Sequence, residues 1–270
     1  MKRIGFAFAC VIALIAIAAP ASAATVERLY VLDCGHARAP DQSRWSPGVN
    51  VGVPIDISDN CYLIRHGHQW LLWDTGIPDA VADMPNGMVG GPIPWRRPIK
   101  LFTQLKALGV SPASIRYVAV SHTHADHVGN VDMFPKSTLL IQRAEWDFAF
   151  APGKPPPFNP KRPAKKLSGD YDIFADGSAR LISTPGHTPG HQSLLVHLPK
   201  TGWVILSGDV AHFRSNWDNR RVPSMNTDRD QTLASMQHIA DLMKQYHAQL
   251  WINHDAAQTA SMLHPPHYYD

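Results

Sequence analysis

Residues 121–127 read Ser-His-Thr-His-Ala-Asp-His and place four metal-binding side chains within six positions. The preceding residues, 115–120, are mostly apolar and rich in β-branched side chains, which predicts a β-strand. Gly129 and Asn130 then predict a turn. The cluster therefore follows a strand end, where α/β-type folds usually form their sites. Histidine and aspartate together suit zinc and similar divalent ions, so a metal site is favoured over histidines that only fill a loop or core.

Further His and Asp residues follow other predicted strands. Residues 184–191 read Thr-Pro-Gly-His-Thr-Pro-Gly-His, residues 207–209 read Ser-Gly-Asp, and residues 253–255 read Asn-His-Asp. The strands that precede these three segments are expected at residues 180–183, 203–206 and 249–252. Each segment is weak evidence alone, but together with 121–127 they indicate one shared site. Asp74, after a strand at 69–73, is either a loop-structuring acid near the metals or an ordinary turn residue.

The other patterns predict a strand-rich core with helices outside. Further strands are expected at residues 26–32, 60–66, 138–141, 171–174 and 193–197. Helices are expected at residues 98–108, 143–150, 228–246 and 255–262. Residues 38–53 are expected to form a loop, and residues 151–163, with six prolines, cannot form a regular element. This order favours a layered sandwich of the α+β class over an alternating βαβ series.

Residues 1–23 are predicted to be a cleaved export signal. Lys2 and Arg3 give a basic start, residues 6–19 are apolar and uncharged, and residues 21–23 read Ala-Ser-Ala, which fits the small-x-small cleavage rule. The apolar run is shorter than the roughly 20 residues that span a membrane, so an uncleaved anchor is disfavoured. We expect residues 24–270 to be a single domain in the periplasm or outside the cell, with no membrane anchor.

Charge argues against a nucleic-acid partner. The 25 basic residues include Lys2 and Arg3, so 23 would face 22 acidic residues after cleavage, and the net charge would be near +1. Such a chain lacks the basic excess that nucleic-acid binding requires.

Cys34 and Cys61 are the two cysteines that remain after cleavage. Both lie in early strand-like segments, and two cysteines in an oxidising compartment can pair. The alternative is two buried free thiols, and the sequence leaves both readings open. Neither cysteine has the spacing of a metal site.

The pattern His122-x-His124-x-Asp126-His127, followed by His187, Asp209 and His254, resembles the dinuclear metal signature of the metallo-β-lactamase superfamily. The resemblance extends from about residue 26 to the C-terminus. It implies a four-layer αβ/βα sandwich with the metals at one edge between two sheets. Residues 71–76, 184–191 and 254–255 are most similar to the corresponding motifs of the N-acyl-homoserine lactonases.

The resemblance also assigns the metal ligands. It implies two divalent ions, with zinc the leading choice, although iron, cobalt and manganese accept the same ligands. The seven residues divide into His122, His124 and His187 for one ion, Asp126, His127 and His254 for the other, and Asp209 as a bridge. His191, the second histidine of its motif, is not a ligand by this match.

The implied reaction is the opening of an N-acyl-homoserine lactone, which would quench quorum sensing, by a metal-bridged hydroxide that attacks the carbonyl. Asp126 is then also a candidate catalytic residue that carries a proton to the leaving oxygen. His212 is the second candidate, because many lactonases of this family have a tyrosine at this position, three residues after the bridging aspartate. It either donates a hydrogen bond to the substrate or lies on the surface without a role.

Apolar residues in the segment 84–98 are candidates for substrate contacts. Met88, Ile93 and Trp95 alternate with glycine and proline there, so they cover either an apolar part of a small-molecule lactone or the protein core. The resemblance also favours a homodimer.

Three other readings compete with the lactonase. A β-lactamase suits an exported protein, but Asp209 argues against it because the lactamases lack a bridging aspartate. Hydrolysis of a thioester, another ester, a sulfate or a phosphodiester on the same scaffold is the second reading. The third is a non-catalytic metal-binding protein, which would have a closed ligand shell rather than room for water and substrate.

Overall fold

The computed structural model describes Met1 and residues 24–89 and 93–270. Residues 2–23, which contain the predicted export signal, and residues 90–92 lie outside the described residues. Within the described part of the chain, no helix is both long enough and apolar enough to cross a membrane.

The first sheet has six strands in the order β1-β2-β3-β4-β5-β6. Strands β1 to β3 pair antiparallel, whereas β3 to β6 pair parallel. The strands are β1 Arg28–Ala39, β2 Ile55–His66, β3 Gln69–Trp73, β4 Ile115–Ala119, β5 Thr138–Gln142 and β6 Ala164–Leu167.

The second sheet has five strands in the order β11-β10-β9-β8-β7. Strands β7 to β10 pair antiparallel, and β10 pairs parallel with β11. The strands are β7 Tyr171–Asp172, β8 Ala179–Ser183, β9 Gln192–Leu198, β10 Gly202–Leu206 and β11 Gln249–Trp251.

The helices are mostly short, apart from α5. They are α1 Leu101–Ala107, α2 Ala125–Val128, α3 Arg143–Ala149, α4 Arg214–Asp218, α5 Arg229–Tyr246 and α6 Ala256–Ala260. Single 3₁₀ turns form at η1 Gln42–Arg44, η2 Asp79–Asp83, η3 Pro112–Ser114 and η4 Val131–Met133.

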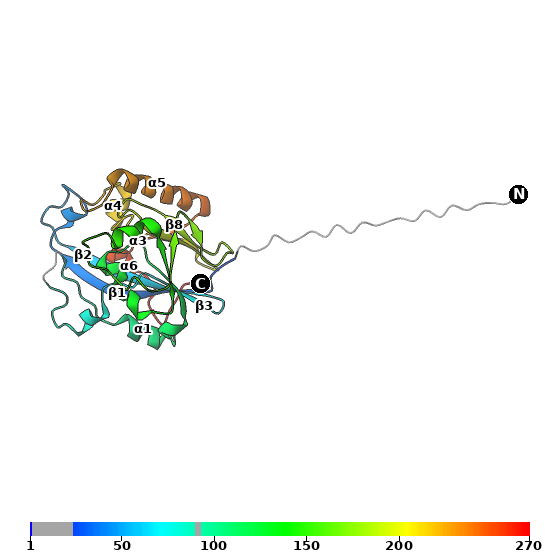
Figure 1. The fold of residues 1–270 in the computed structure, drawn as a ribbon. Coiled ribbons are helices and arrows are strands. Elements are labelled where there is room, and N and C mark those ends of the chain that lie inside the picture. Colours follow the sequence, from blue (N-terminus) through cyan, green and yellow to red (C-terminus); the bar gives the residue numbers. More distant parts are fainter. Residues whose placement is uncertain (2–23, 90–92) are drawn as a thin grey trace.

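Each sheet packs against an apolar core on both of its faces, because successive side chains of its strands point to opposite sides. In β9, Leu194 and Val196 face the core between the sheets, whereas Leu195 faces Ile239 of α5. In β3, Leu71 faces the core between the two sheets, whereas Leu72 faces the outer core that contains Leu105 of α1. Successive strand residues point to opposite faces, so strands covered on both sides are apolar throughout. The result is the predicted four-layer αβ/βα sandwich, with α5 and α1 on opposite sides of the sheets (Figure 1).

Strands β1, β2, β6 and β7 differ most from the sequence-based expectation. Strand β2 begins at Ile55, five residues before the expected start. Strand β1 continues to Ala39 because a register shift between Asp33 and Gly35 lets it keep pairing with β2, so the expected loop at 38–53 begins later. Strand β7 ends at Asp172, two residues early. Strand β6 was not expected, because its Ala-Lys-Lys-Leu sequence has the polar pattern of an edge strand.

Cys34 of β1 and Cys61 of β2 form a disulfide, with Cα atoms 5.7 Å apart. Both residues are fully buried in the core beneath α1. The bond closes a loop with a sequence separation of 27, which contains the irregular segment between the two strands. Of the two readings left open by the sequence, the structure contains the disulfide.

Removing this disulfide by the double substitution Cys34→Ala/Cys61→Ala is expected to lower the free energy of unfolding by about 3 kcal/mol, because the unfolded chain regains the entropy of an open loop. Urea unfolding of the variant and of the unreduced wild type measures the difference. Two reactive thiols in the denatured, unreduced wild type would contradict the prediction.

Candidate metal centre

The predicted ligands converge from the ends of strands in both sheets. Strand β4 leads into residues 121–127, β8 into 184–191, β10 into 207–209 and β11 into 252–255. A hydrogen bond from the amide of Gln192 to the carbonyl oxygen of Ser121, 2.9 Å long, joins the two sheets beside the site. The structure therefore brings together all seven residues that the sequence nominated as ligands.

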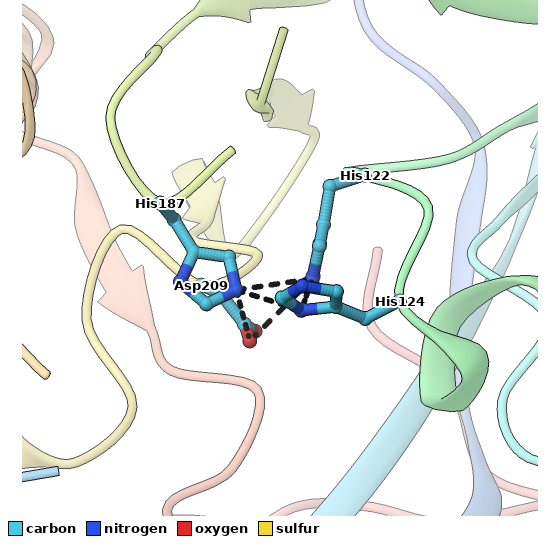
Figure 2. A group of neighbouring side chains, drawn as sticks. All are labelled: His122, His124, His187 and Asp209. Carbon is cyan, nitrogen blue, oxygen red and sulfur yellow. Dashed lines mark hydrogen bonds and ion pairs between the residues drawn. The ribbon is translucent and has the colours of Figure 1, made fainter. Parts of the chain in front are cut away.

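His122, His124 and His187 form the first group, with Asp209 beside them (Figure 2). His122 Nε2 lies 2.8 Å from His124 Nδ1, and His187 Nε2 lies 3.2 Å and 3.0 Å from these two atoms. Ligand atoms of a tetrahedral zinc ion are about 3.3 Å apart, given zinc–nitrogen distances of about 2.0–2.1 Å. The three nitrogens therefore point at one position with a spacing close to that of metal ligands.

Asp126, His127 and His254 form the second group. The side chain of Asp126 is 19% exposed, and its Oδ2 atom lies 3.9 Å from Nε2 of the buried His254. Helix α2 begins at Ala125, so its first turn carries Asp126 and His127 to this side of the site while His124 stays on the other.

The carboxylate of Asp209 stands between the two groups. Its Oδ2 atom lies 3.3 Å from Nε2 of His187, whereas Oδ1 lies 3.3 Å from Nε2 of His127 and 3.1 Å from Nε2 of His254. Each oxygen thus faces a different group of imidazoles. This is the arrangement that a bridging carboxylate requires.

Burial and charge divide the histidines. Burial lowers the pKa of His122 and His187 well below the usual value, so both rings are neutral and offer lone pairs. For His254, burial is outweighed by the carboxylates of Asp209 and Asp126, which raise its pKa to about 9. Burial also opposes ionisation of Asp209, but the surrounding imidazoles outweigh it and hold its pKa well below the usual range. The Asp126 side of the site therefore stabilises positive charge.

The positions of the ligand atoms are explained better by a shared metal ion than by hydrogen bonds between the ligands. Within the described chain, His127 Nε2 and Asp209 Oδ1 have no hydrogen-bond partner although both are buried. Unpaired buried polar atoms are costly, and atoms aimed at a common ion are a physical reason for them. Positive charge is favoured at the same place, which a divalent cation supplies. The site is therefore suited to divalent metal binding.

Asp74 contacts the Nδ1 atom of His127, on the side of the ring away from the other ligands. Its Oδ2 atom lies 2.9 Å from His127 Nδ1 and accepts a hydrogen bond from the Ser121 hydroxyl, while Oδ1 accepts from the Ser121 amide at 2.7 Å. A hydrogen bond on Nδ1 fixes the ring so that Nε2 faces the other predicted ligands, as a metal-binding histidine requires. Of the two roles considered for Asp74, the structure places it beside the metal site.

His191 supports Asp209 instead of joining the ligands. Its Nε2 atom accepts a hydrogen bond from the Asp209 amide at 2.8 Å, and its Nδ1 atom lies 3.0 Å from the carbonyl oxygen of Thr184. Burial lowers its pKa to about 4, which keeps the ring neutral as this pairing requires. Gly208 allows this close approach, because a Cβ atom there would lie 2.6 Å from His191 Nε2.

His212 is buried beside the metal ligands, with 3% of its surface exposed, so it is not a surface residue. Its Nε2 atom lies 3.0 Å from Asp209 Oδ2. Its ring stacks near the ring of His254, with centroids 5.5 Å apart. His212 therefore contacts the carboxylate that stands between the two groups.

A cavity of about 290 Å³ opens over the ligands. Of the three apolar residues proposed from the segment 84–98, Trp95 and Ile93 line this cavity. Met88 lies behind them instead, with its amide hydrogen-bonded to the Trp95 carbonyl oxygen at 2.8 Å. Four further lining residues could not be predicted, because they lie in a 3₁₀ turn, in irregular segments or on a strand extension without a periodic signal: Arg44, Trp45, Ile57 and Met225.

The fold and the strand-end ligands identify the class of protein. The chain belongs to the metallo-beta-lactamase superfamily, since the model of that family matches residues 56–252. The resemblance drawn from the ligand motifs is thereby confirmed, together with the fold class.

Within this superfamily, the chain is similar to several N-acyl homoserine lactonases. The chain is 33% identical to the N-acyl homoserine lactonase AttM of Azorhizobium caulinodans over 263 residues, which cover 90% of this chain and 98% of the relative. It is 27% identical to the N-acyl homoserine lactonase AiiA of Bacillus thuringiensis subsp. kurstaki, covering 90% and 99%. A crystal structure of a quorum-quenching N-acyl homoserine lactone hydrolase superimposes with a TM-score of 0.81 at 26% identity, covering 92% of this chain and 100% of that one.

A further solved structure shows a ligand in such a site. It is an N-acyl homoserine lactone hydrolase with the product N-hexanoyl-L-homoserine bound at its catalytic metal centre. This chain matches it with a TM-score of 0.80 and 27% identity, covering 91% of this chain and 100% of that one.

Asp74→Asn is expected to weaken metal binding by about 10- to 100-fold, because one side-chain amide cannot accept from both His127 and the Ser121 amide. Competition with a chromogenic chelator measures the affinity. Asp172→Asn is the matched control, since Asp172 supports a turn by accepting from the Ala175 and Gly177 amides. Equal affinities for the two variants would show that Asp74 is only a turn residue.

Proposed function

We propose that this protein is a metal-dependent hydrolase that opens the lactone ring of N-acyl-homoserine lactones and so quenches quorum sensing. The observation that carries the proposal is a His/Asp cluster that contains all seven predicted ligands, beside a cavity whose remaining wall is mostly apolar. Relatives and structural neighbours along nearly the whole chain support it, because those proteins are N-acyl homoserine lactonases.

The metals of this proposal are two divalent ions, with zinc the leading choice. His122, His124 and His187 would hold one ion, Asp126, His127 and His254 would hold the other, and the two oxygens of Asp209 would bridge them. When bound, such ions lower the pKa of water toward about 7 and polarise a carbonyl group, which supplies a nucleophile and an electrophile at neutral pH.

The residues of the chain then divide the remaining work. Asp126 is the most exposed of the ligands that surround the second position, so its carboxylate is placed to take a proton and return it to the leaving ring oxygen. His212 donates a hydrogen bond from Nε2 to Asp209, because a carboxylate oxygen can only accept. This bond fixes the orientation of the bridging carboxylate while the His212 ring forms part of the cavity wall.

The cavity wall suits a substrate with a polar ring and an apolar chain. Five of the predicted ligands line the cavity, and Trp45 and Trp95 are among the apolar residues that complete its wall. Both indoles are buried, with 3% and 5% of their surfaces exposed. A lactone ring would therefore lie against the metals, and the acyl chain would pack against Trp45, Ile57, Ile93, Trp95 and Met225.

Metal-quantified protein is expected to open the rings of a series of N-acyl-homoserine lactones, and a chelator is expected to abolish the reaction because the nucleophile depends on the metals. The rate is measured as formation of the N-acyl-homoserine product, which is monitored through the proton released on ring opening or by chromatography. No ring opening by fully loaded protein would contradict the substrate class, and faster hydrolysis of a chromogenic cephalosporin would favour a β-lactamase instead.

His212→Ala is expected to lower kcat/KM for the best lactone by about 10- to 100-fold, since Asp209 loses the hydrogen bond that orients it. Steady-state kinetics on protein of measured metal content gives the comparison. His197→Ala is the control, because His197 stacks on Trp203 with centroids 4.3 Å apart and contacts none of the ligands named above. An unchanged kcat/KM in His212→Ala would remove this residue from the mechanism.

A further inference from the structure

The segment before helix α5 is tied to the turn that carries His187. The Thr227 amide donates to the carbonyl oxygen of His187 at 3.1 Å, and the Asp228 amide donates to that of Gly186 at 2.9 Å. Gly186 permits the contact, because a Cβ atom there would lie 2.3 Å from the amide nitrogen of Thr232. The first turn of α5 and the His187 turn are therefore packed backbone to backbone.

A chain of hydrogen bonds runs from this helix to the His187 ring. The Thr232 hydroxyl lies 2.7 Å from the carbonyl oxygen of Asp228, which can only accept, so the single hydroxyl hydrogen is used there. The hydroxyl oxygen must then accept from Asn226, whose Nδ2 atom lies 3.0 Å away. With its NH₂ group committed to Thr232, Asn226 presents Oδ1 to His187 Nδ1 at 2.9 Å.

This chain determines which nitrogen of His187 carries the proton. Because Asn226 Oδ1 can only accept, the hydrogen must be on His187 Nδ1. In the neutral ring the lone pair is then on Nε2, the atom that lies 3.0 Å from His124 Nδ1 and 3.3 Å from Asp209 Oδ2. A flipped Asn226 amide would favour the opposite tautomer, in which a hydrogen on Nε2 would face the metal.

We propose that Thr232 and Asn226 are positioning residues that hold His187 in its metal-binding tautomer. Thr232 acts through Asn226, and neither side chain is itself a ligand. Thr232 is buried, with 1% of its surface exposed, so water does not compete for its hydroxyl group. The inference rests on the metal site of the proposed function but not on its substrate.

Thr232→Val tests the pair because it keeps the side-chain shape and removes only the hydroxyl group. The Asn226 amide is then free to flip, and zinc affinity, measured by chelator competition, is expected to fall about 10-fold. Ser235→Ala is the matched control: Ser235 lies on the same helix and donates to the Pro185 carbonyl oxygen at 2.7 Å, but it does not contact Asn226. Its affinity for zinc is expected to equal that of the wild type.

A rescue experiment distinguishes a lost orientation of the Asn226 side chain from a defect of folding. Asn226→Asp offers an acceptor whichever way the side chain turns, so the double variant Thr232→Val/Asn226→Asp is expected to regain wild-type zinc affinity. Asn226→Leu, which leaves the Thr232 hydroxyl on Asp228, is expected to lose affinity without loss of helix by circular dichroism. Nitrogen-15 NMR of the imidazoles in metal-free protein is expected to show His187 protonated on Nδ1 in the wild type and a shifted tautomer ratio in Thr232→Val.

Two results would overturn the proposal. One is wild-type zinc affinity in both Thr232→Val and Asn226→Leu. The other is a Thr232→Val defect that Asn226→Asp does not repair, since a defect of helix packing would persist in the double variant. Neither result depends on lactone hydrolysis, so failure of the proposed substrate remains distinguishable from failure of this inference.

Discussion

Asp209 carries a buried carboxylate that lies between 3.0 and 3.7 Å from five imidazole rings. A buried charge of this kind is stable only when opposite charge and hydrogen bonds surround it. The rings are supplied by segments that follow strands of both sheets, so the two sheets must be assembled before the carboxylate is compensated. The positions of β4, β8, β10 and β11 are in this sense coupled through one side chain.

Three of the ligands also have a hydrogen-bond partner on their far side, and these partners come from unrelated parts of the chain. Asp74 at the end of β3 holds His127, the backbone carbonyl of Ser58 in β2 lies 2.7 Å from His254 Nδ1, and Asn226 before α5 holds His187. A hydrogen bond at Nδ1 leaves Nε2 for the metal in all three rings. The ligand geometry therefore depends on three elements outside the ligand motifs.

The sequence was most informative where chemistry and local structure coincide. His122, His124, Asp126 and His127 are dense in sequence and follow an apolar strand, so the site could be located from one segment. Strands β3 and β9 were also recognisable, because apolar runs bounded by turn residues are a local signal. Trp45, Met225 and Asn226 could not be predicted, because single residues in irregular segments acquire a role only when the fold brings them to the site. Strand β6 was missed for a related reason, since pairing with β5 and not its own composition makes it a strand.

The cavity wall and the metal ligands have different structural origins, and this difference affects how the protein can change. Ile57 lies on the extension of the β1–β2 ribbon, Trp95 beside an isolated bridge from Arg96 to His36, and Trp45 just after a 3₁₀ turn. Insertions and substitutions in such segments are tolerated more readily than changes at the strand ends between two packed sheets. Descendants of this sequence can therefore acquire walls for other acyl groups, or for other esters, while inheriting the same reactive centre unchanged.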